Sequence, residues 1–99
     1  MAITANVDLG NGVTASSCYI IVPTAYVKKF EDDSFKLIYD VHIYKDASDR
    51  ATNNDMKQIK CREVDHHKIT YDPTTSDNPF KLAYTHLKTN SKLSSVSDV

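Results

Sequence analysis

The sequence predicts a mainly β fold: a small antiparallel β-sandwich or barrel-like domain with one C-terminal helix and an extended tail. Apolar and polar residues alternate with a period of two in several segments, and one segment is a dense β-branched run. Helical spacing of apolar residues is clear only once, near the C-terminus. Because 99 residues provide for a single core, we expect one β-rich domain over residues 1–89, with the helix at about 78–88, and a C-terminal tail over 90–99.

The first expected hairpin lies close to the N-terminus. Ile3, Ala5, Val7 and Leu9 occupy alternate positions, which is typical of a strand with one buried face. The next three residues are Gly-Asn-Gly, and both residue types accept a positive φ at low energetic cost. This predicts a tight turn that leads into a second strand.

The middle of the chain predicts the central strands. Residues 18–22 read CYIIV, the pattern of a buried strand, and Pro23 then either ends this strand or places it at a sheet edge. Residues 26–30 and 35–44 are expected to form an antiparallel hairpin across an acidic tip at 31–33. In the longer strand, every second residue is expected to face the core: Phe35, Leu37, Tyr39, Val41 and Ile43.

The following segments are less regular. Residues 45–55 contain no large apolar side chain, so we expect a surface loop. Residues 56–64 fit a strand or a helix, and we favour a strand. Residues 68–71 predict a short strand that leads into a turn at 72–75.

The C-terminal helix has a capping residue and an apolar stripe. Asp77 or Asn78 can cap the first free amides, and proline at position 79 has the backbone angle of a first helical residue. A helix of this length does not persist alone in water, so it must pack on the sheet or on a neighbouring subunit. The residues of the stripe are Phe80, Ala83, Tyr84 and Leu87.

The tail over 90–99 is rich in serine and is expected to be disordered when it is free. Its sparse apolar residues, Leu93, Val96 and Val99, recur every three positions. The tail is therefore either a loose end or an arm that orders on a partner's surface, and we favour the arm.

Composition narrows the class of protein. The net charge of −1 offers no overall basic footprint for nucleic acid. The N-terminus lacks the pattern of a signal peptide, and no apolar run is long enough to span a membrane. Two cysteines, Cys18 and Cys61, are fewer than a secreted disulfide scaffold of this size carries, so we expect free thiols, with a bridge between them left open.

Few residues suggest chemistry. His66 and His67 could bind a metal in a loop, with His42 or His86, but adjacent residues on a strand point to opposite faces. The short, fixed ligand spacing of zinc sites is also lacking, so we expect no metal and no cofactor. Cys61 fits a buried apolar residue better than a nucleophile. No catalytic motif occurs, and we expect no enzymatic activity.

The six tyrosines suggest contacts instead. Tyrosine is favoured at protein interfaces and also stacks on bases, and the absence of a basic surplus favours protein over nucleic acid. The candidate interface residues are Tyr19, Tyr26 and Tyr44, together with the apolar residues of the tail, Leu93, Val96 and Val99.

Several short strings resemble small, largely uncharacterised structural proteins associated with the tail, baseplate or neck region of tailed-bacteriophage virions. The C-terminal strings are Ala83-Tyr84, Leu87-Lys88-Thr89 and Asp98-Val99. The others are the opening ITANVDLGNGV, Tyr19-Ile20, Val41-His42-Ile43-Tyr44 and the loop with Arg50.

The resemblance implies a non-enzymatic structural component of a virion, made in the host cytoplasm and present in multiple copies. Its location in the particle would be the tail, the baseplate, the collar or a fibre attachment. Its partners would be other virion proteins and copies of itself in a symmetric assembly, with no nucleic acid and no membrane. The alternatives are a capsid decoration or cement protein and a small OB-like nucleic-acid-binding module.

Overall fold

The computed structural model describes residues 2–53, 59–74 and 78–99 of the chain. Its β-strands are β1 (Ile3–Gly10), β2 (Val13–Lys29), β3 (Phe35–Tyr44), β4 (His66–Tyr71) and β5 (Leu93–Asp98). Its helices are α1 (Ala47–Asn53), α2 (Arg62–Asp65) and α3 (Pro79–Leu87). The prediction of a mainly β fold is confirmed. The strands form one antiparallel sheet in the order β4-β3-β2-β1-β5.

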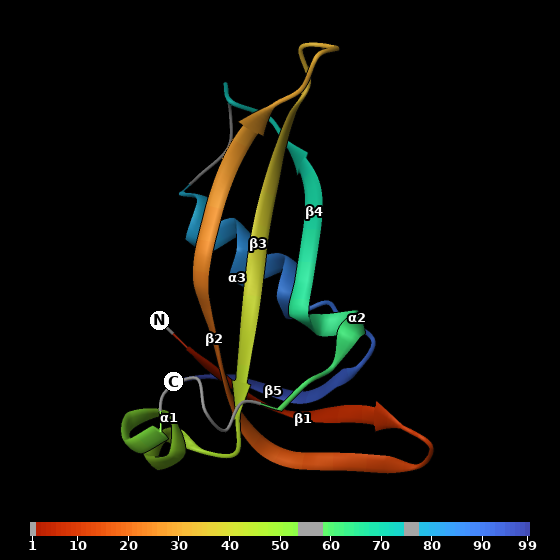
Figure 1. Ribbon diagram of the computed structural model, residues 1–99, viewed down its shortest axis with the longest axis vertical. Coiled ribbons are helices and arrows are strands. Elements are labelled where there is room, and N and C mark those ends of the chain that lie inside the picture. Colours follow the sequence, from red (N-terminus) through yellow and green to blue (C-terminus); the bar gives the residue numbers. More distant parts are fainter. Residues whose placement is uncertain (1, 54–58, 75–77) are drawn as a thin grey trace.

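This sheet is strongly coiled because β2 belongs to both of its halves. The first part of β2 pairs with β1, and most of the strand, from Tyr19 onward, pairs with β3. Figure 1 shows β1 and β5 lying across the lower end of the molecule, while β3 and β4 run along its long axis. Irregular pairing within β1 and β2 supports the bend, since a β-bulge increases local twist. The described strands therefore resemble an opened barrel more than two stacked sheets.

The expected N-terminal hairpin is present. Gly10, Asn11 and Gly12 have φ values of 88°, 54° and 77°, so the turn uses a backbone conformation that these residue types accept. Ile3, Ala5 and Val7 of β1 are at most 1% exposed, while Leu9 near the tip is 37% exposed.

The expected hairpin of β2 and β3 is also present, and β3 lines the core as predicted. Leu37, Tyr39, Val41 and Ile43 are at most 2% exposed, and only Phe35, near the tip, is partly open. The opposite face of β3 is less open than the alternation suggests, since Tyr44 is fully buried. The guanidinium group of Arg50 in α1 lies 5.9 Å from the Tyr44 ring.

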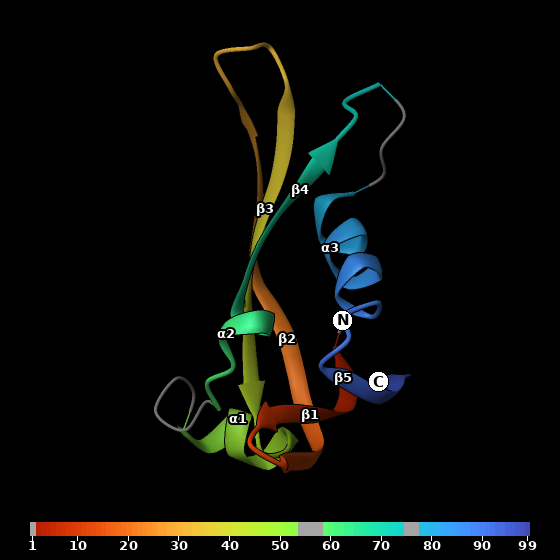
Figure 2. The same cartoon turned by 90° about the vertical axis from the view of Figure 1, so that its right-hand side faces the viewer.

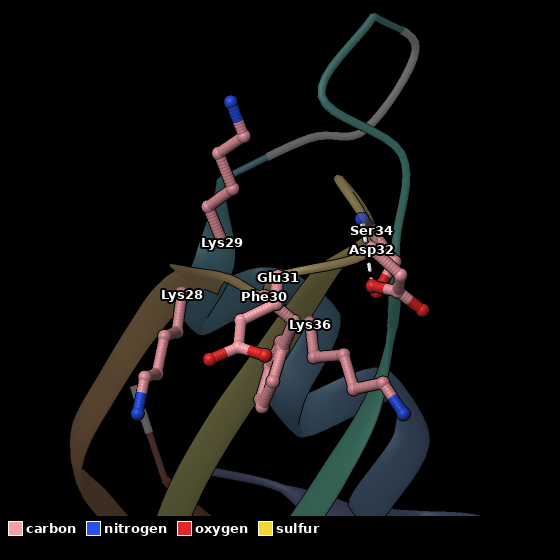
Figure 3. A pocket seen from close by; sticks show the side chains of 7 residues that line it. All are labelled: Lys28, Lys29, Phe30, Glu31, Asp32, Ser34 and Lys36. Atoms are coloured by element: carbon pink, nitrogen blue, oxygen red, sulfur yellow. Dashed lines mark hydrogen bonds between the residues drawn. The ribbon is translucent and has the colours of Figure 1, made fainter.

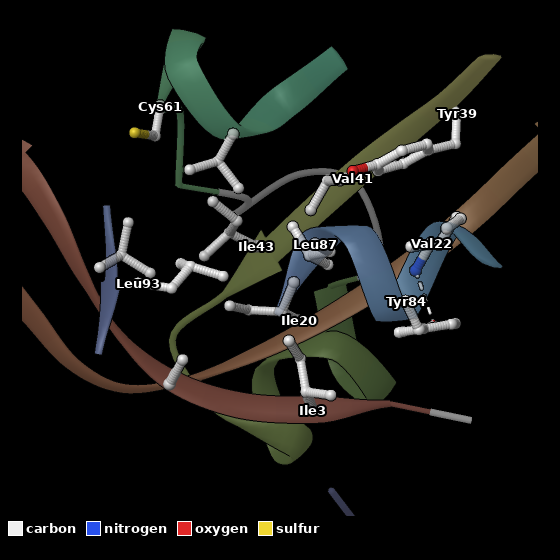
Figure 4. Packing of buried hydrophobic residues seen from close by; sticks show 14 of the residues in the cluster. Ile3, Ile20, Val22, Tyr39, Val41, Ile43, Cys61, Tyr84, Leu87 and Leu93 are labelled. Atoms are coloured by element: carbon white, nitrogen blue, oxygen red, sulfur yellow. Dashed lines mark hydrogen bonds between the residues drawn. The ribbon is translucent and has the colours of Figure 1, made fainter. Parts of the chain in front are cut away.

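Helix α3 covers the core face of the sheet, as Figure 2 shows from the side. Its start follows the predicted pattern: Pro79 is the first helical residue, and the Asn78 side chain accepts a hydrogen bond from the backbone N–H of Phe80 at 2.8 Å. Tyr84 and Leu87 pack into the core (Figure 4), whereas Phe80 stays 41% exposed. The chain's own sheet thus provides the packing surface that this short helix requires.

Two predictions for the middle of the chain are wrong. The expected loop at 45–55 contains α1, because Ala47, Arg50 and Ala51 favour a helix even without a large apolar residue. The expected strand at 56–64 is reduced to a bridge between Ile59 and Ile43, and α2 follows, with Val64 fully buried. Residues 56–58 lie outside the described residues. The short strand predicted at 68–71 is present within β4, and the turn at 73–74 follows it, while residue 75 is not described.

The C-terminal tail is not a separate part. Residues 93–98 form β5, which pairs with β1 as an edge strand of the sheet, so the expected division between residues 89 and 90 is wrong. Leu93 packs in the core at 8% exposure, and the Val99 N–H donates to the carbonyl of Ala2 at 3.1 Å. Backbone hydrogen bonds to β1 order residues 93–98. The serine-rich side-chain pattern of these residues does not predict a strand. Both cysteines are free and buried, as expected.

Candidate functional site

The upper part of β2 is an open sheet edge. Pairing with β1 reaches Ile3 opposite Ile20, and from there to Lys29 the strand keeps only β3 as a described strand neighbour. The N–H of Phe30 donates to the carbonyl of Ser34 across the hairpin at 2.8 Å, so Phe30 directs its backbone groups toward β3. Because direction alternates along a strand, the backbone N–H and C=O groups of Ala25, Val27 and Lys29 point outward at this edge.

A bulge marks the beginning of the open edge. The pairing with β3 shifts between Ile21 and Thr24, and Pro23 lies inside this irregularity. Proline has no N–H to contribute, so it suits a bulge or an edge. The backbone N–H of Val22 donates to the hydroxyl oxygen of Tyr84 at 2.8 Å (Figure 4). The strand does not end at Pro23, because β2 continues to Lys29 and joins the two segments predicted at 18–22 and 26–30. Of the two alternatives for Pro23, the structure supports the sheet edge.

Two hollows adjoin at this hydrogen bond, since Val22 and Tyr84 line both of them. One, of about 580 Å³, lies between the sheet and α1 and is also lined by Tyr19, Ile21, Pro23, Ala47, Arg50 and Ala51. The other, of about 420 Å³, lies beside the start of α3 and is also lined by Asn78, Phe80 and Lys81. Burial raises the pKa of Tyr84, which keeps its hydroxyl group protonated between the hollows. We call the two hollows and the outward edge of residues 24–29 the edge groove.

Two of the candidate interface tyrosines lie at or near this groove. Tyr19 is half-buried and lines the hollow beside α1. Tyr26 is 48% exposed and belongs to the open part of β2. Their positions are compatible with the predicted contact role.

The other candidates differ in accessibility. Tyr44 is fully buried within the chain and Leu93 is 8% exposed, so neither is free to contact a partner, and these two predictions are wrong. Both side chains contribute to internal packing, which a single-sequence pattern does not distinguish from an interface. Val96 is partly buried against the core, and Val99 is 66% exposed beside the end of β5.

The side chains of His66 and His67 point to opposite faces of the sheet, as those of adjacent residues in a strand do. Both belong to β4, and Nδ1 of His66 lies 2.5 Å from a carboxylate oxygen of Asp40. The ring of His67 lies on the core side, 5.1 Å from that of Tyr39 and 5.5 Å from that of His86. Burial lowers the pKa of His67, and the nearby His86 lowers it further. Across residues 2–53, 59–74 and 78–99, no three His, Cys, Asp or Glu side chains are grouped as metal ligands.

Sequence reasoning missed the residues that complete the groove. Arg50 has no predicted role beyond its place in the resemblance, and the helical spacing predicts Phe80 in the buried stripe, whereas both line the hollows. One sequence feature does indicate an exposed Phe80. This residue directly follows Pro79, at the N-terminal end of the helix, where the helix extends beyond the surface on which it packs. No corresponding signal existed for Arg50, because its placement depends on α1.

No known protein family, no curated protein and no solved structure matches this chain. Among the described residues, no helix is both long and apolar enough to span a membrane.

Proposed function

We propose that the chain is a non-enzymatic structural subunit of a tailed-phage virion, and that it holds a neighbouring subunit by strand addition along the open edge of β2. The observation that carries the proposed mode of binding is the edge groove. There, outward backbone groups at residues 25, 27 and 29 lie beside two side-chain hollows. The virion setting rests on the resemblance described above.

Strand addition fits this edge for a physical reason. An added strand gains affinity from main-chain hydrogen bonds and specificity from pockets that accept its alternate side chains. Residues 24–29 pair with β3 without a register shift, so the edge has a regular spacing of donors and acceptors. The exposed rings of Tyr26 and Phe80 add apolar and aromatic surface of the kind that interfaces favour.

The opposite end of the sheet is less suitable. The pairing of β5 with β1 shifts in register between Ser94 and Ser97, and Ser95 between them has a φ of 52°. Such a bulge twists an edge away from further pairing and is a common protection against unwanted association. The regular upper part of β2 is therefore better suited to docking than β5 is.

The proposed station is the tail, baseplate, collar or fibre attachment, with several copies per particle. Capsid decoration is the alternative within the same class. Mass spectrometry of purified particles of the encoding phage tests the setting: we expect the chain at a stoichiometric level, and its absence from intact particles would overturn the proposal. Particles separated into heads and tails would then distinguish the two stations.

A proline substitution tests the mode of binding. Ala25→Pro removes an outward N–H but leaves the ladder with β3 intact, and edge strands accept proline at such positions. Ala25→Val retains the N–H and is the matched control. We expect both variants to fold, and only Ala25→Pro to lose incorporation into particles. Equal incorporation of the two would show that the edge is not the docking site.

A further inference from the structure

The sheet face opposite α3 carries an uncompensated group of lysines. In the pairing of β2 with β3, Lys28 is directly opposite Lys36, and Tyr26 is opposite Ile38, which in turn is opposite Lys68 of β4. Residues that oppose each other in a sheet point to the same face. We call this the lysine face and define it by Tyr26, Lys28, Phe30, Lys36 and Lys68.

The lysines converge on one aromatic ring. Their Nζ atoms lie 5.5, 5.6 and 5.3 Å from the centroid of the Phe30 ring, for Lys28, Lys36 and Lys68 respectively. Figure 3 shows Lys28 and Lys36 on the two sides of this ring, with Lys29 pointing away. The ring and the two flanking lysines border an open hollow of about 490 Å³ at the hairpin tip.

The nearby acids do not balance these charges. Among the described residues, none of the three lysines forms an ion pair, whereas Lys29 pairs with Asp33 at 3.4 Å. Asp32 accepts hydrogen bonds from the backbone N–H and the hydroxyl of Ser34, at 3.1 and 2.6 Å. Asp40 is engaged by His66. Asp32 keeps its negative charge in its hydrogen bonds with Ser34 and interacts with Lys36, and Glu31 lines the same hollow. Two carboxylates thus lie near the three lysines that surround the ring, so positive charge remains in excess.

This arrangement is unfavourable for the free protein. Like charges directly opposite each other in a sheet are destabilising, and cation–π attraction to the half-buried Phe30 ring offsets only part of the repulsion. An anionic ligand would remove the repulsion. The net charge of −1 conceals this local excess, because most of the acids lie elsewhere in the chain.

We propose that the lysine face binds single-stranded nucleic acid, with bases stacking on Tyr26 and on Phe30. The lysines turn away from the faces of the Phe30 ring to contact phosphates. Aromatic rings beside basic groups on an open surface provide this kind of sequence-tolerant binding. The carboxylates of an acidic peptide would satisfy the lysines but offer no aromatic ring to stack on Phe30 and Tyr26. A duplex would likewise leave the rings without exposed base faces. The proposal rests on neither strand addition at β2 nor the virion setting, although Tyr26 belongs to both surfaces.

Fluorescence anisotropy of the full chain with a labelled oligothymidylate tests the proposal. We expect salt-sensitive binding, to which three phosphate contacts contribute a log–log salt slope of about −2. The variant with Lys28→Gln, Lys36→Gln and Lys68→Gln should bind about tenfold more weakly or worse. A variant with Lys45→Gln, Lys60→Gln and Lys81→Gln has the same net charge and should bind like the parent.

The aromatic contribution is tested separately with Phe30→Leu. We expect about a tenfold loss of affinity with an unchanged salt slope, because stacking is lost and the phosphate contacts remain. All variants are first compared by thermal melting, and the triple variant of the lysine face should melt no lower than the parent. Three results would overturn the proposal: no binding at low salt, equal weakening in both triple variants, or equal competition by a polyglutamate peptide, which would indicate an acidic protein partner.

Discussion

The hydrogen bond between Val22 and Tyr84 allows a sharp test of how α3 is joined to the sheet. Val22 is 5% exposed and Tyr84 is 4% exposed, and the donor–acceptor distance is 2.8 Å. Tyr84→Phe removes only the hydroxyl group, so the ring continues to fill its place in the core. The backbone N–H of Val22 then loses its acceptor in a buried position, which costs about 1–3 kcal/mol.

The corresponding change in melting temperature is large enough to measure. For a domain of this size, 1 kcal/mol corresponds to roughly 4–8 °C, so Tyr84→Phe should melt at least several degrees below the parent. Differential scanning calorimetry or circular dichroism measures this difference. Tyr26→Phe is the matched control, because Tyr26 is 48% exposed and its hydroxyl group has access to water. If the two variants melt alike, the bond does not contribute as argued.

Three further predictions concern the core, the last strand and pH. Leu37→Ala should lower the free energy of unfolding by about 2–5 kcal/mol in urea melts, since the residue is fully buried; a parent-like midpoint would contradict its place in the core. Deletion of residues 93–99 should destabilise the domain by removing β5 and exposing β1, with a lower melting temperature as the measured result; an unchanged temperature would mean that β5 contributes nothing. The pKa of His67 is lowered from 6.5 in the folded chain, so the folded state binds its proton less tightly than the unfolded state. Stability should therefore fall as pH drops below about 6.5, and the fall should be smaller in His67→Gln than in the parent when urea midpoints are compared at neutral and mildly acidic pH.

The elements that sequence reasoning predicted correctly are those with a local signature. The alternation in β1 and β3, the Gly-Asn-Gly turn and the Asn78-Pro79 start of α3 each depend on residues close together in the chain. Local conformational preference and local burial agree at these positions, so the residue pattern predicts the secondary structure correctly.

The elements that were missed depend on distant partners. The strand β5 is ordered by pairing with β1 from the other end of the chain, although its serines alone favour no regular structure. The lysine face requires the registers of three strands at once, and the edge groove requires a bulge that places Tyr84 beside Val22. Tyr44 was misjudged because α1, which lies over it, was not expected. Tertiary contacts, more than local preference, decide these positions.

The pairing of β1 with β5 has a consequence for how the protein folds during synthesis. The residues of β1 leave the ribosome early, but their outer neighbour in the sheet is translated only after residues 93–98 have been added. Contacts between such distant segments form late, because closing a long stretch of chain is entropically costly. Until then β1 presents a bare edge that other nascent chains can pair with. The last strand of the sheet to be made is therefore also the one that closes this edge against such pairing.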